Sequence, residues 1–382
     1  MKRTFASILI PALMISAIVM NSCNGGGRTL TSATGTIYEC LVVMDDEPLT
    51  QDQRDQLAQL SLYNNGSAYD EDVTSLSGLV RQVMEANMPA LPQMEPYFTV
   101  SIVPHAAFDD FLKPTRNILI LDINPERYTM AKAKIRNDYW STPQAVYTIQ
   151  SPDADTFIAW WKENGESVRK WFVDREIQRQ GKFLRGYTNQ EARAALQRRF
   201  SSDMYIPEDY MLIKDTAVVL EGRKINVLWC CNNKGPMRKD VLVYGYDYTE
   251  ADAFTADKLN RMRDLVFGDL ISGSVEGSYM GTEYKVFPPE YNEITISQPA
   301  DKNHPAIHVW AAEIRGLWKV INGEAMGGPY VSLTRLDEIN QQVITTEVFL
   351  YASGQKKRNA LRQAEAILYT LRLPQDLMLQ EK

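Results

Sequence analysis

The sequence has few of the residues that build metal sites and catalytic nucleophiles. Its 382 residues include three histidines and four cysteines, and no Cys-x-x-Cys pair occurs. His304 and His308 are four residues apart, but Pro305 between them argues against a shared helix face. There is no Gly-x-Ser-x-Gly motif. We therefore expect no metal, no cofactor and no catalytic residue, which favours a binding protein over an enzyme.

The chain also lacks a surplus of basic residues. Its formal net charge is −7, whereas nucleic-acid binding needs a basic surface. It has no low-complexity tract, and 45% of its residues are hydrophobic, which is enough for one large core or two domains. We therefore expect a folded globular protein that does not bind nucleic acid.

The N-terminus has the layout of a bacterial lipoprotein export signal. Two basic residues precede an apolar stretch of 16 residues, Phe5–Met20, which is shorter than the about 20 residues of a transmembrane helix. Ser22 then precedes Cys23, as a small residue precedes the lipidated cysteine of such signals. We predict a signal peptide over residues 1–22 and acylation of Cys23, with palmitate as a typical acyl chain. The alternative is a short N-terminal anchor with an incidental cysteine.

Acylation of Cys23 would hold the protein at a membrane. Two or three acyl chains form a stable anchor, because each buried methylene contributes about 0.8 kcal/mol. Residues 23–36 are rich in Gly, Ser and Thr and predict a flexible tether. Cleavage would change the formal charge from −7 to −9, so anionic lipid head groups would add little attraction. We expect a cell-envelope protein whose membrane contact is its acyl anchor.

The remaining cysteines, Cys40, Cys230 and Cys231, lie inside apolar strand-like runs. Cysteine is among the residues most often buried, so we expect three free packing thiols. A bridge from Cys40 to Cys230 or Cys231 is the alternative, because an exported protein enters an oxidising compartment.

Hydrophobic periodicity predicts alternating strands and helices in the first half and more strands in the second. In the first half we expect strands over 37–44, 97–103, 117–123 and 145–150, and helices over 72–88, 153–185 and 189–200. In the second half we expect strands over 210–214, 217–220, 225–231, 241–248, 293–297, 307–314, 330–336 and 343–351, a loop over 273–281, and helices over 256–270 and 356–373.

This order of elements favours an α+β fold with mixed, largely antiparallel sheets packed against helices. Each half offers a strand, a helix and paired strands, which would suit two ferredoxin-like units. We place the N-terminal α/β-type half at residues 37–204 and the C-terminal α+β half at residues 205–382.

Three aspartates follow or end apolar strands. Asp45 and Asp46 come after the first strand, and Asp122 lies at the end of the strand over 117–123. If these strands are parallel neighbours, their carboxyl ends converge where open sheets bind ligands. The carboxylates could then serve acid–base chemistry or hold Mg²⁺ or Ca²⁺. The plainer interpretation is that acidic residues end strands and enter solvated turns.

The most distinctive stretch runs from Arg315 to Pro329. Arg315 and Trp318 precede Gly327 and Gly328, whose backbone amides could approach an anion. A loop with positive φ at these glycines is the structural interpretation, which we favour. Trp318 then anchors the sheet.

The long predicted helix is aromatic and basic. From Lys162 to Arg199 there are ten Lys and Arg against five Asp and Glu. Such a helix could grip an acidic partner or lie on a membrane surface. A core stripe of Phe157, Trp161, Val168 and Phe172 with solvated basic residues opposite is the simpler interpretation. The candidate partner surface on this helix consists of Trp160, Trp161, Arg169, Lys170 and Trp171.

Several short runs resemble a family of uncharacterised lipoproteins from Bacteroidota-type Gram-negative bacteria, which are described only as a domain of unknown function. The runs are Leu41–Asp46, Leu91–Gln93 with Arg116–Ile120, and Arg315–Trp318 with Met326–Pro329. The resemblance implies export and acyl anchoring, and it supplies no catalytic or binding residues. It also implies an outer-membrane protein facing the periplasm, because residues 24–28 lack the acidic patch that sends such lipoproteins to the cell surface.

We therefore expect an envelope lipoprotein that binds a protein, lipid or glycan without catalysis. The alternative is a carboxylate-dependent hydrolase acting on envelope glycan through Asp45, Asp46 or Asp122. Glycosidases need two carboxyl groups about 5–9.5 Å apart in one groove.

Overall fold

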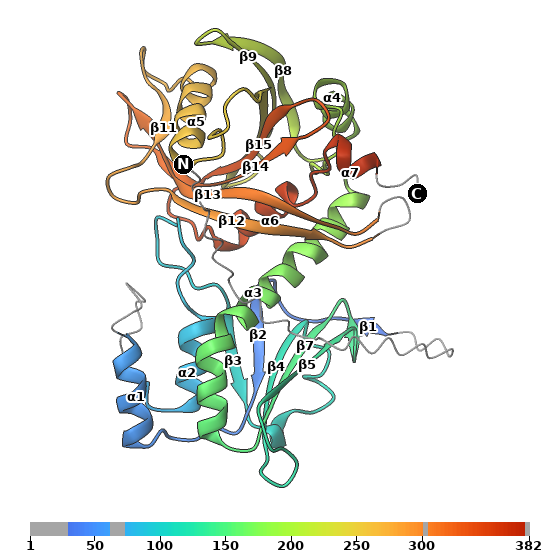
Figure 1. Ribbon diagram of the computed structural model, residues 1–382, viewed down its shortest axis with the longest axis vertical. Coiled ribbons are helices and arrows are strands. Elements are labelled where there is room, and N and C mark those ends of the chain that lie inside the picture. Colours follow the sequence, from blue (N-terminus) through green and yellow to red (C-terminus); the bar gives the residue numbers. More distant parts are fainter. Residues whose placement is uncertain (1–29, 62–72, 301–304, 379–382) are drawn as a thin grey trace, which may run out of the picture.

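The computed structural model describes residues 30–61, 73–300 and 305–378 (Figure 1). Cys23, the predicted signal peptide and His304 lie outside these residues. The elements of the first half are β1 (Thr31–Ser32), β2 (Glu39–Val43), α1 (Gln51–Ser61), α2 (Leu76–Met84), β3 (Thr99–Val103), a 3-10 turn (His105–Ala107), β4 (Asn117–Ile123), β5 (Lys132–Asn137), β6 (Ser141–Thr142), β7 (Ala145–Ser151), α3 (Ala154–Gly186) and α4 (Gln190–Phe200).

The second half is dominated by long strands. Its elements are β8 (Met211–Leu220), β9 (Arg223–Asn232), β10 (Arg238–Asp247), α5 (Ala256–Leu270), β11 (Tyr279–Thr282), β12 (Glu290–Gln298), β13 (Ile307–Ile321), β14 (Gly327–Asp337), β15 (Gln342–Tyr351), α6 (Arg358–Leu368) and α7 (Pro374–Met378). The predicted α+β class is confirmed.

The sheet of the first half has the order β3-β2-β4-β7-β5. Its first four strands are parallel, and only β5 runs antiparallel to its neighbour. The helices α2 and α3 cover one face, as Figure 1 shows, where Leu79, Trp161 and Phe172 join a shared core. The opposite face carries a smaller apolar cluster beside Trp140. Parallel strands buried on both faces account for the continuous apolar run of β4.

The sheet of the second half has the order β11-β13-β14-β15-β10-β9-β8, with β12 also paired to β13. All its strand pairs are antiparallel. Residues of α4 and α6 pack on one face, and those of α5 pack on the other. The two halves therefore do not share a topology, and the idea of two ferredoxin-like units is wrong for the first, whose strands are mostly parallel.

The helix α3 connects the halves. With 33 residues it is about 50 Å long, and in Figure 1 it runs from the first sheet to the second half. Its early residues pack on the first sheet, whereas Leu184 near its end belongs to the core of the second half. Contacts of α4 are with β8 and β9. The predicted division after residue 204 stays a prediction.

Some predictions about the elements were wrong. Residues 211–220 form one strand, β8, rather than two strands around a turn at Asp215, because Asp215 and Thr216 pair with β9. The predicted loop over 273–281 ends in β11. The strand β5 and helix α1 were not predicted. Residues 31–34 of the predicted tether pair with β6 and Thr115, so their backbone groups are held by hydrogen bonds.

The cysteine prediction is confirmed. The three cysteines in the described residues, Cys40, Cys230 and Cys231, are free and buried. A bridge between Cys40 and either of the other two is therefore absent from this part of the chain. None of the helices in the described ranges is long and apolar enough to cross a membrane.

A buried ion network holds α6 against the second sheet. The guanidinium of Arg315 donates to the carboxylates of Glu313 and Glu365, and Arg362 donates to Glu365 at 3.0 Å. The side chains of Arg315, Arg362 and Glu365 are each at least 93% buried. Burial would raise the pKa of Glu365, but the charges of Arg315 and Arg362 give it a net lowered pKa.

We predict that Glu365→Gln lowers the free energy of unfolding by about 3–5 kcal/mol, because it leaves two buried arginines short of an anion. Urea denaturation of the full chain measures this change. The control is Asp174→Asn, which breaks the exposed pair with Lys170 and should cost less than about 1 kcal/mol. Because the pKa of Glu365 is lowered by folding, the stability it contributes is lost as pH falls. The difference in the free energy of unfolding between wild type and Glu365→Gln should therefore shrink in acid. Equal losses of stability in Glu365→Gln and Asp174→Asn would contradict the role of the buried network.

Candidate functional site

The carboxyl edge of the first sheet brings the predicted acidic residues to neighbouring strands. The strands β2 and β4 are parallel neighbours, with Val43 opposite Ile120, as the sequence interpretation required. Each carboxylate nevertheless has its own partner. Asp45 accepts hydrogen bonds from the backbone and ring of His105 at 3.1 and 3.2 Å. Asp46 accepts from the backbone and hydroxyl of Ser77 at 2.9 and 2.6 Å.

Asp122 lies near the end of β4 and also has partners of its own. It accepts a hydrogen bond from the hydroxyl of Tyr128 at 2.5 Å and pairs with Arg127 at 3.4 Å. Across the described ranges, no group of three or more His, Cys, Asp and Glu side chains could hold a metal ion. Each of the three aspartates therefore has a hydrogen-bond partner of its own, and a shared acidic site at this edge stays a prediction.

The aromatic and basic helix α3 is mainly a core element. The stripe of Phe157, Trp161, Val168 and Phe172 is buried, as the simpler interpretation predicted. The indole N–H of Trp161 donates to the carbonyl of Leu79.

The rest of the predicted partner surface on α3 is divided. Arg169 donates to the carbonyl of Val83 at 2.9 Å and lies over the ring of Tyr97. Trp160 and Trp171 are half-buried against the core, and Lys170 is exposed. This helix offers no continuous aromatic surface to a partner.

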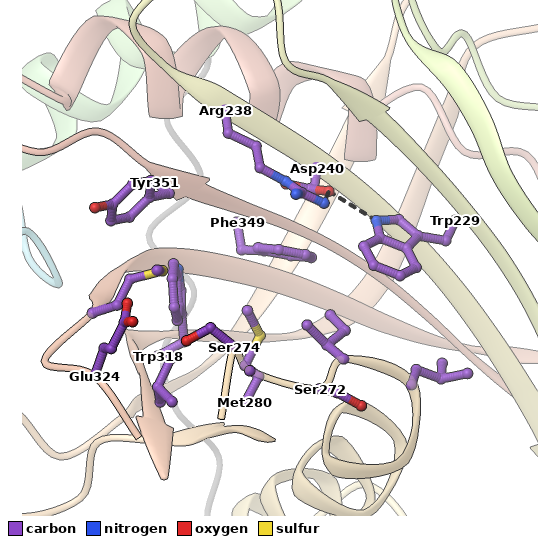
Figure 2. A pocket seen from close by; sticks show the side chains of 15 residues that line it. Trp229, Arg238, Asp240, Ser272, Ser274, Met280, Trp318, Glu324, Phe349 and Tyr351 are labelled. Carbon is purple, nitrogen blue, oxygen red and sulfur yellow. Dashed lines mark hydrogen bonds and ion pairs between the residues drawn. The ribbon is translucent and has the colours of Figure 1, made fainter. Parts of the chain in front are cut away.

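The stronger candidate is a pocket in the second half, which we call the aromatic pocket (Figure 2). It has a volume of about 470 Å³ and lies between the second sheet and the segment that follows α5. Its walls are formed by Trp229, Arg238, Asp240, Leu270, Ile271, Ser272, Gly273, Ser274, Met280, Trp318, Val320, Glu324, Met326, Phe349 and Tyr351.

The floor of the aromatic pocket is made of ring faces. We define the floor as Trp229, Trp318, Phe349, Met280 and Leu270, each no more than 7% exposed. The indole of Trp229 donates to Asp240 at 2.9 Å, and that of Trp318 donates to the carbonyl of Leu350 at 3.0 Å. Both indole N–H groups are therefore used within the protein, so the floor presents apolar surface.

One charged pair borders this floor. Arg238 donates through Nε and Nη2 to both oxygens of Asp240 at 2.9 and 3.0 Å, and its guanidinium lies 5.8 Å from the ring of Trp229. These hydrogen bonds raise the pKa of Arg238. Asp240 is buried, whereas the Arg238 side chain is 46% exposed. The pair therefore places a hydrogen-bonded guanidinium in the pocket lining, beside Asp240 (Figure 2).

The glycines of the distinctive stretch explain how the rings pack. Gly328 lies in β14 opposite Trp318, and a Cβ there would be 2.0 Å from the carbonyl oxygen of Leu350 and 3.0 Å from the indole nitrogen. Gly316 likewise lies beneath the ring of Tyr330, where an added Cβ would be 2.7 Å from a ring carbon. The missing side chains let each aromatic ring lie flat across the neighbouring strand.

The predicted positive-φ loop at Gly327 and Gly328 was therefore wrong, because β14 begins at Gly327 and both residues pair with β13. Neither glycine is among the described residues with positive φ. Arg315 points to the opposite face of the sheet, toward Glu365. The suggested anion site of Arg315 and these glycines is not assembled, although Trp318 does anchor the sheet.

The sequence interpretation missed the residues that complete the pocket. Trp229, Asp240 and Phe349 lie on three neighbouring strands, with Asp240 opposite Phe349. The only local signal was the pair Arg238 and Asp240, two charges on a strand face that continues with Leu242, Tyr244 and Tyr246. Their meeting with Trp229 depends on strand register, which the sequence pattern did not supply.

Two parts of the chain are similar to known families. Residues 68–185 match the model of a domain of unknown function, DUF8532, and residues 189–370 match that of another, DUF4837. No curated protein matches the chain at a significant level. The aromatic pocket lies entirely within the second match. The resemblance to uncharacterised families is thus supported at the level of these domains.

We predict that Gly328→Ala destabilises the protein by more than about 2 kcal/mol, because the added methyl overlaps the Leu350 carbonyl and displaces Trp318. Thermal unfolding and tryptophan fluorescence of the full chain measure both effects. The matched control is Gly186→Ala at the end of α3, where an added Cβ meets nothing within 4 Å. That variant should be neutral or slightly stabilising. Equal stability of the two variants would show that the close approach at Gly328 is unimportant.

Proposed function

We propose that this protein is a lipid-anchored component of the cell envelope that binds a ligand in the aromatic pocket without changing it chemically. The observation that carries the binding role is the pocket itself. A volume of about 470 Å³ lies within the about 300–1,000 Å³ of small-molecule sites, which are mostly apolar with a few fixed polar groups. Buried rings beside the Arg238–Asp240 pair have this composition.

The location rests on the N-terminal sequence. A short apolar segment after two basic residues, followed by Ser22 and Cys23, is typical of lipoprotein export signals. Acyl chains on Cys23 would anchor the protein to the outer membrane, facing the periplasm. The pocket would then meet ligands of that compartment, and an envelope protein, lipid or glycan are the classes to consider.

The absence of a catalytic role is supported by how the carboxylates are used. Both oxygens of Asp240 accept hydrogen bonds from Arg238, and one also accepts from Trp229. Asp240 therefore positions the guanidinium rather than acting as a free base. Asp45, Asp46 and Asp122 each bind a different partner, so we do not put the glycan hydrolase forward as a second candidate.

We predict that Cys23→Ser releases the protein from acylation and membrane retention, because the thiol is the attachment point of the acyl chains. Mass spectrometry of the mature N-terminus should show acylated cysteine in the wild type and none in the variant. Cys40→Ser, which changes a buried thiol, is the control and should retain the anchor. A mature wild-type protein with an unmodified Cys23 would refute the proposed location.

We predict that Ser274→Trp weakens binding of the neutral fluorescent probe N-phenyl-1-naphthylamine at least tenfold, because the new ring occupies the pocket mouth. Ser274 is exposed and lines the pocket. Glu276→Trp is the matched control, since it adds the same ring at an exposed position two residues away that does not line the pocket. Both full-length variants are titrated with the probe in nanodiscs of the same composition. The fluorescence of probe in the bilayer is then the same for both, and any difference comes from the protein. Equal probe binding by both variants would count against the pocket.

A further inference from the structure

The aromatic pocket divides into an apolar floor and a polar rim. The floor residues defined above expose rings and aliphatic groups, and the N–H groups of both its tryptophans are already bonded to Asp240 and Leu350. We define the rim as Arg238, Ser272, Ser274, Glu324 and Tyr351, which are the more exposed polar residues of the lining. The ligand must therefore match a surface that changes from apolar to polar along its depth.

The floor disfavours a ligand with polar groups all around it. A sugar ring stacks its C–H face on an aromatic ring, but the hydroxyl groups around its edge would find no free donor or acceptor on Trp229, Trp318 or Phe349. A buried hydroxyl without a partner loses its bonds to water and gains nothing in return. A hydrocarbon has no such groups, and it gains free energy from leaving water. The chemistry of the floor thus favours an apolar chain over a glycan.

The rim favours a neutral head that accepts hydrogen bonds. The bonds from Arg238 to Asp240 use Nε and Nη2, and within the described ranges Nη1 remains for a ligand. The charge of Arg238 is balanced by Asp240, and the exposed Glu324 adds a negative charge to the lining. The charged residues of the pocket lining, Arg238, Asp240 and Glu324, therefore sum to a net negative charge, which would repel an anionic head. A carbonyl or hydroxyl oxygen can accept from Nη1 without that repulsion.

Resting on the binding role proposed above, we propose that the aromatic pocket holds a single acyl chain whose neutral head accepts a hydrogen bond from Arg238. The chain lies on the rings of Trp229, Phe349 and Trp318, and the head lies at the rim. The same acyl group could belong to a free membrane lipid or to the lipidated terminus of another protein. Both share the apolar chain and the ester or amide carbonyl that the pocket recognises.

The decisive experiment places a benzophenone amino acid in the full chain at Met326, which lines the pocket and is half-buried. Cells are illuminated, and the adduct on the Met326 peptide is identified by mass spectrometry. The same label at Glu276, which is exposed and outside the lining, is the control. We expect an acyl-bearing adduct at position 326 and none at 276. A lipid mass or an acylated peptide distinguishes the two sources.

Each other outcome is informative. An adduct specific to position 326 that is a glycan or an unacylated peptide would overturn the acyl-chain proposal but leave the binding role intact. Equal adducts at both positions, or none at 326, would overturn both.

Recognition of the head group is tested by letting two amphiphiles compete with N-phenyl-1-naphthylamine for the full-length protein. Both amphiphiles are kept below the concentrations at which they form micelles. We expect 1-dodecanoylglycerol to displace the probe at a concentration at least tenfold lower than dodecylammonium, whose head has no acceptor. Arg238→Lys keeps the charge but removes the guanidinium, so it should weaken 1-dodecanoylglycerol more than dodecylammonium and reduce this ratio to near one. An unchanged ratio in Arg238→Lys, or weaker binding of both compounds alike, would overturn the role of Arg238 in recognising the head.

Discussion

The buried ion network around α6 is the interaction on which the arrangement of the two halves depends. Arg315 from β13 meets Glu365 of α6, and Arg362 from the same helix also bonds to Glu365. Buried charges are tolerated only when they are paired and hydrogen-bonded. This requirement fixes both the rotation of α6 and its position along the sheet, since a small slide would leave an arginine without its carboxylate.

The helix α6 also contacts the first half of the chain. The guanidinium of Arg362 lies 5.8 Å from the ring of Tyr38 and 5.1 Å from that of Tyr97. The carboxylate of Glu95 accepts hydrogen bonds from the backbone N–H groups of Lys357 and Arg358 at the start of α6. A negative group is favourable there because of the unpaired N–H groups and the helix dipole. One face of α6 thus packs against the second sheet, while its N-terminus and the side chain of Arg362 contact the first half.

With α4 and α6 covering one face of the second sheet, the opposite face is free to form the aromatic pocket. There α5 covers part of the sheet and ends at Leu270, and the following segment forms one wall. Gly328 removes the side chain that would otherwise fill the space under Trp318. The pocket therefore forms because α5 ends at Leu270 and because β14 has a glycine at position 328. The two indoles of its floor are held in place by hydrogen bonds to Asp240 and to the carbonyl of Leu350.

Local sequence rules determined the elements that local interactions stabilise. The helix over 256–270 was predicted with the bounds that α5 has, and Asn189 caps α4 by accepting from the N–H of Ala192. The buried stripe of α3 followed from its spacing. By contrast, β5 is exposed along most of its length and is defined by pairing with β7, so its own residues gave no pattern. The sequence by itself thus determined that the segments of α2, α3, α4 and α5 are helical, but not that of α1. It also determined which thiols are buried and which stretch is unusual. Only the tertiary structure decided that Trp318 and Gly328 meet Trp229, Arg238 and Phe349, because register and pairing between distant strands set those neighbours and a hydrophobic pattern does not specify them.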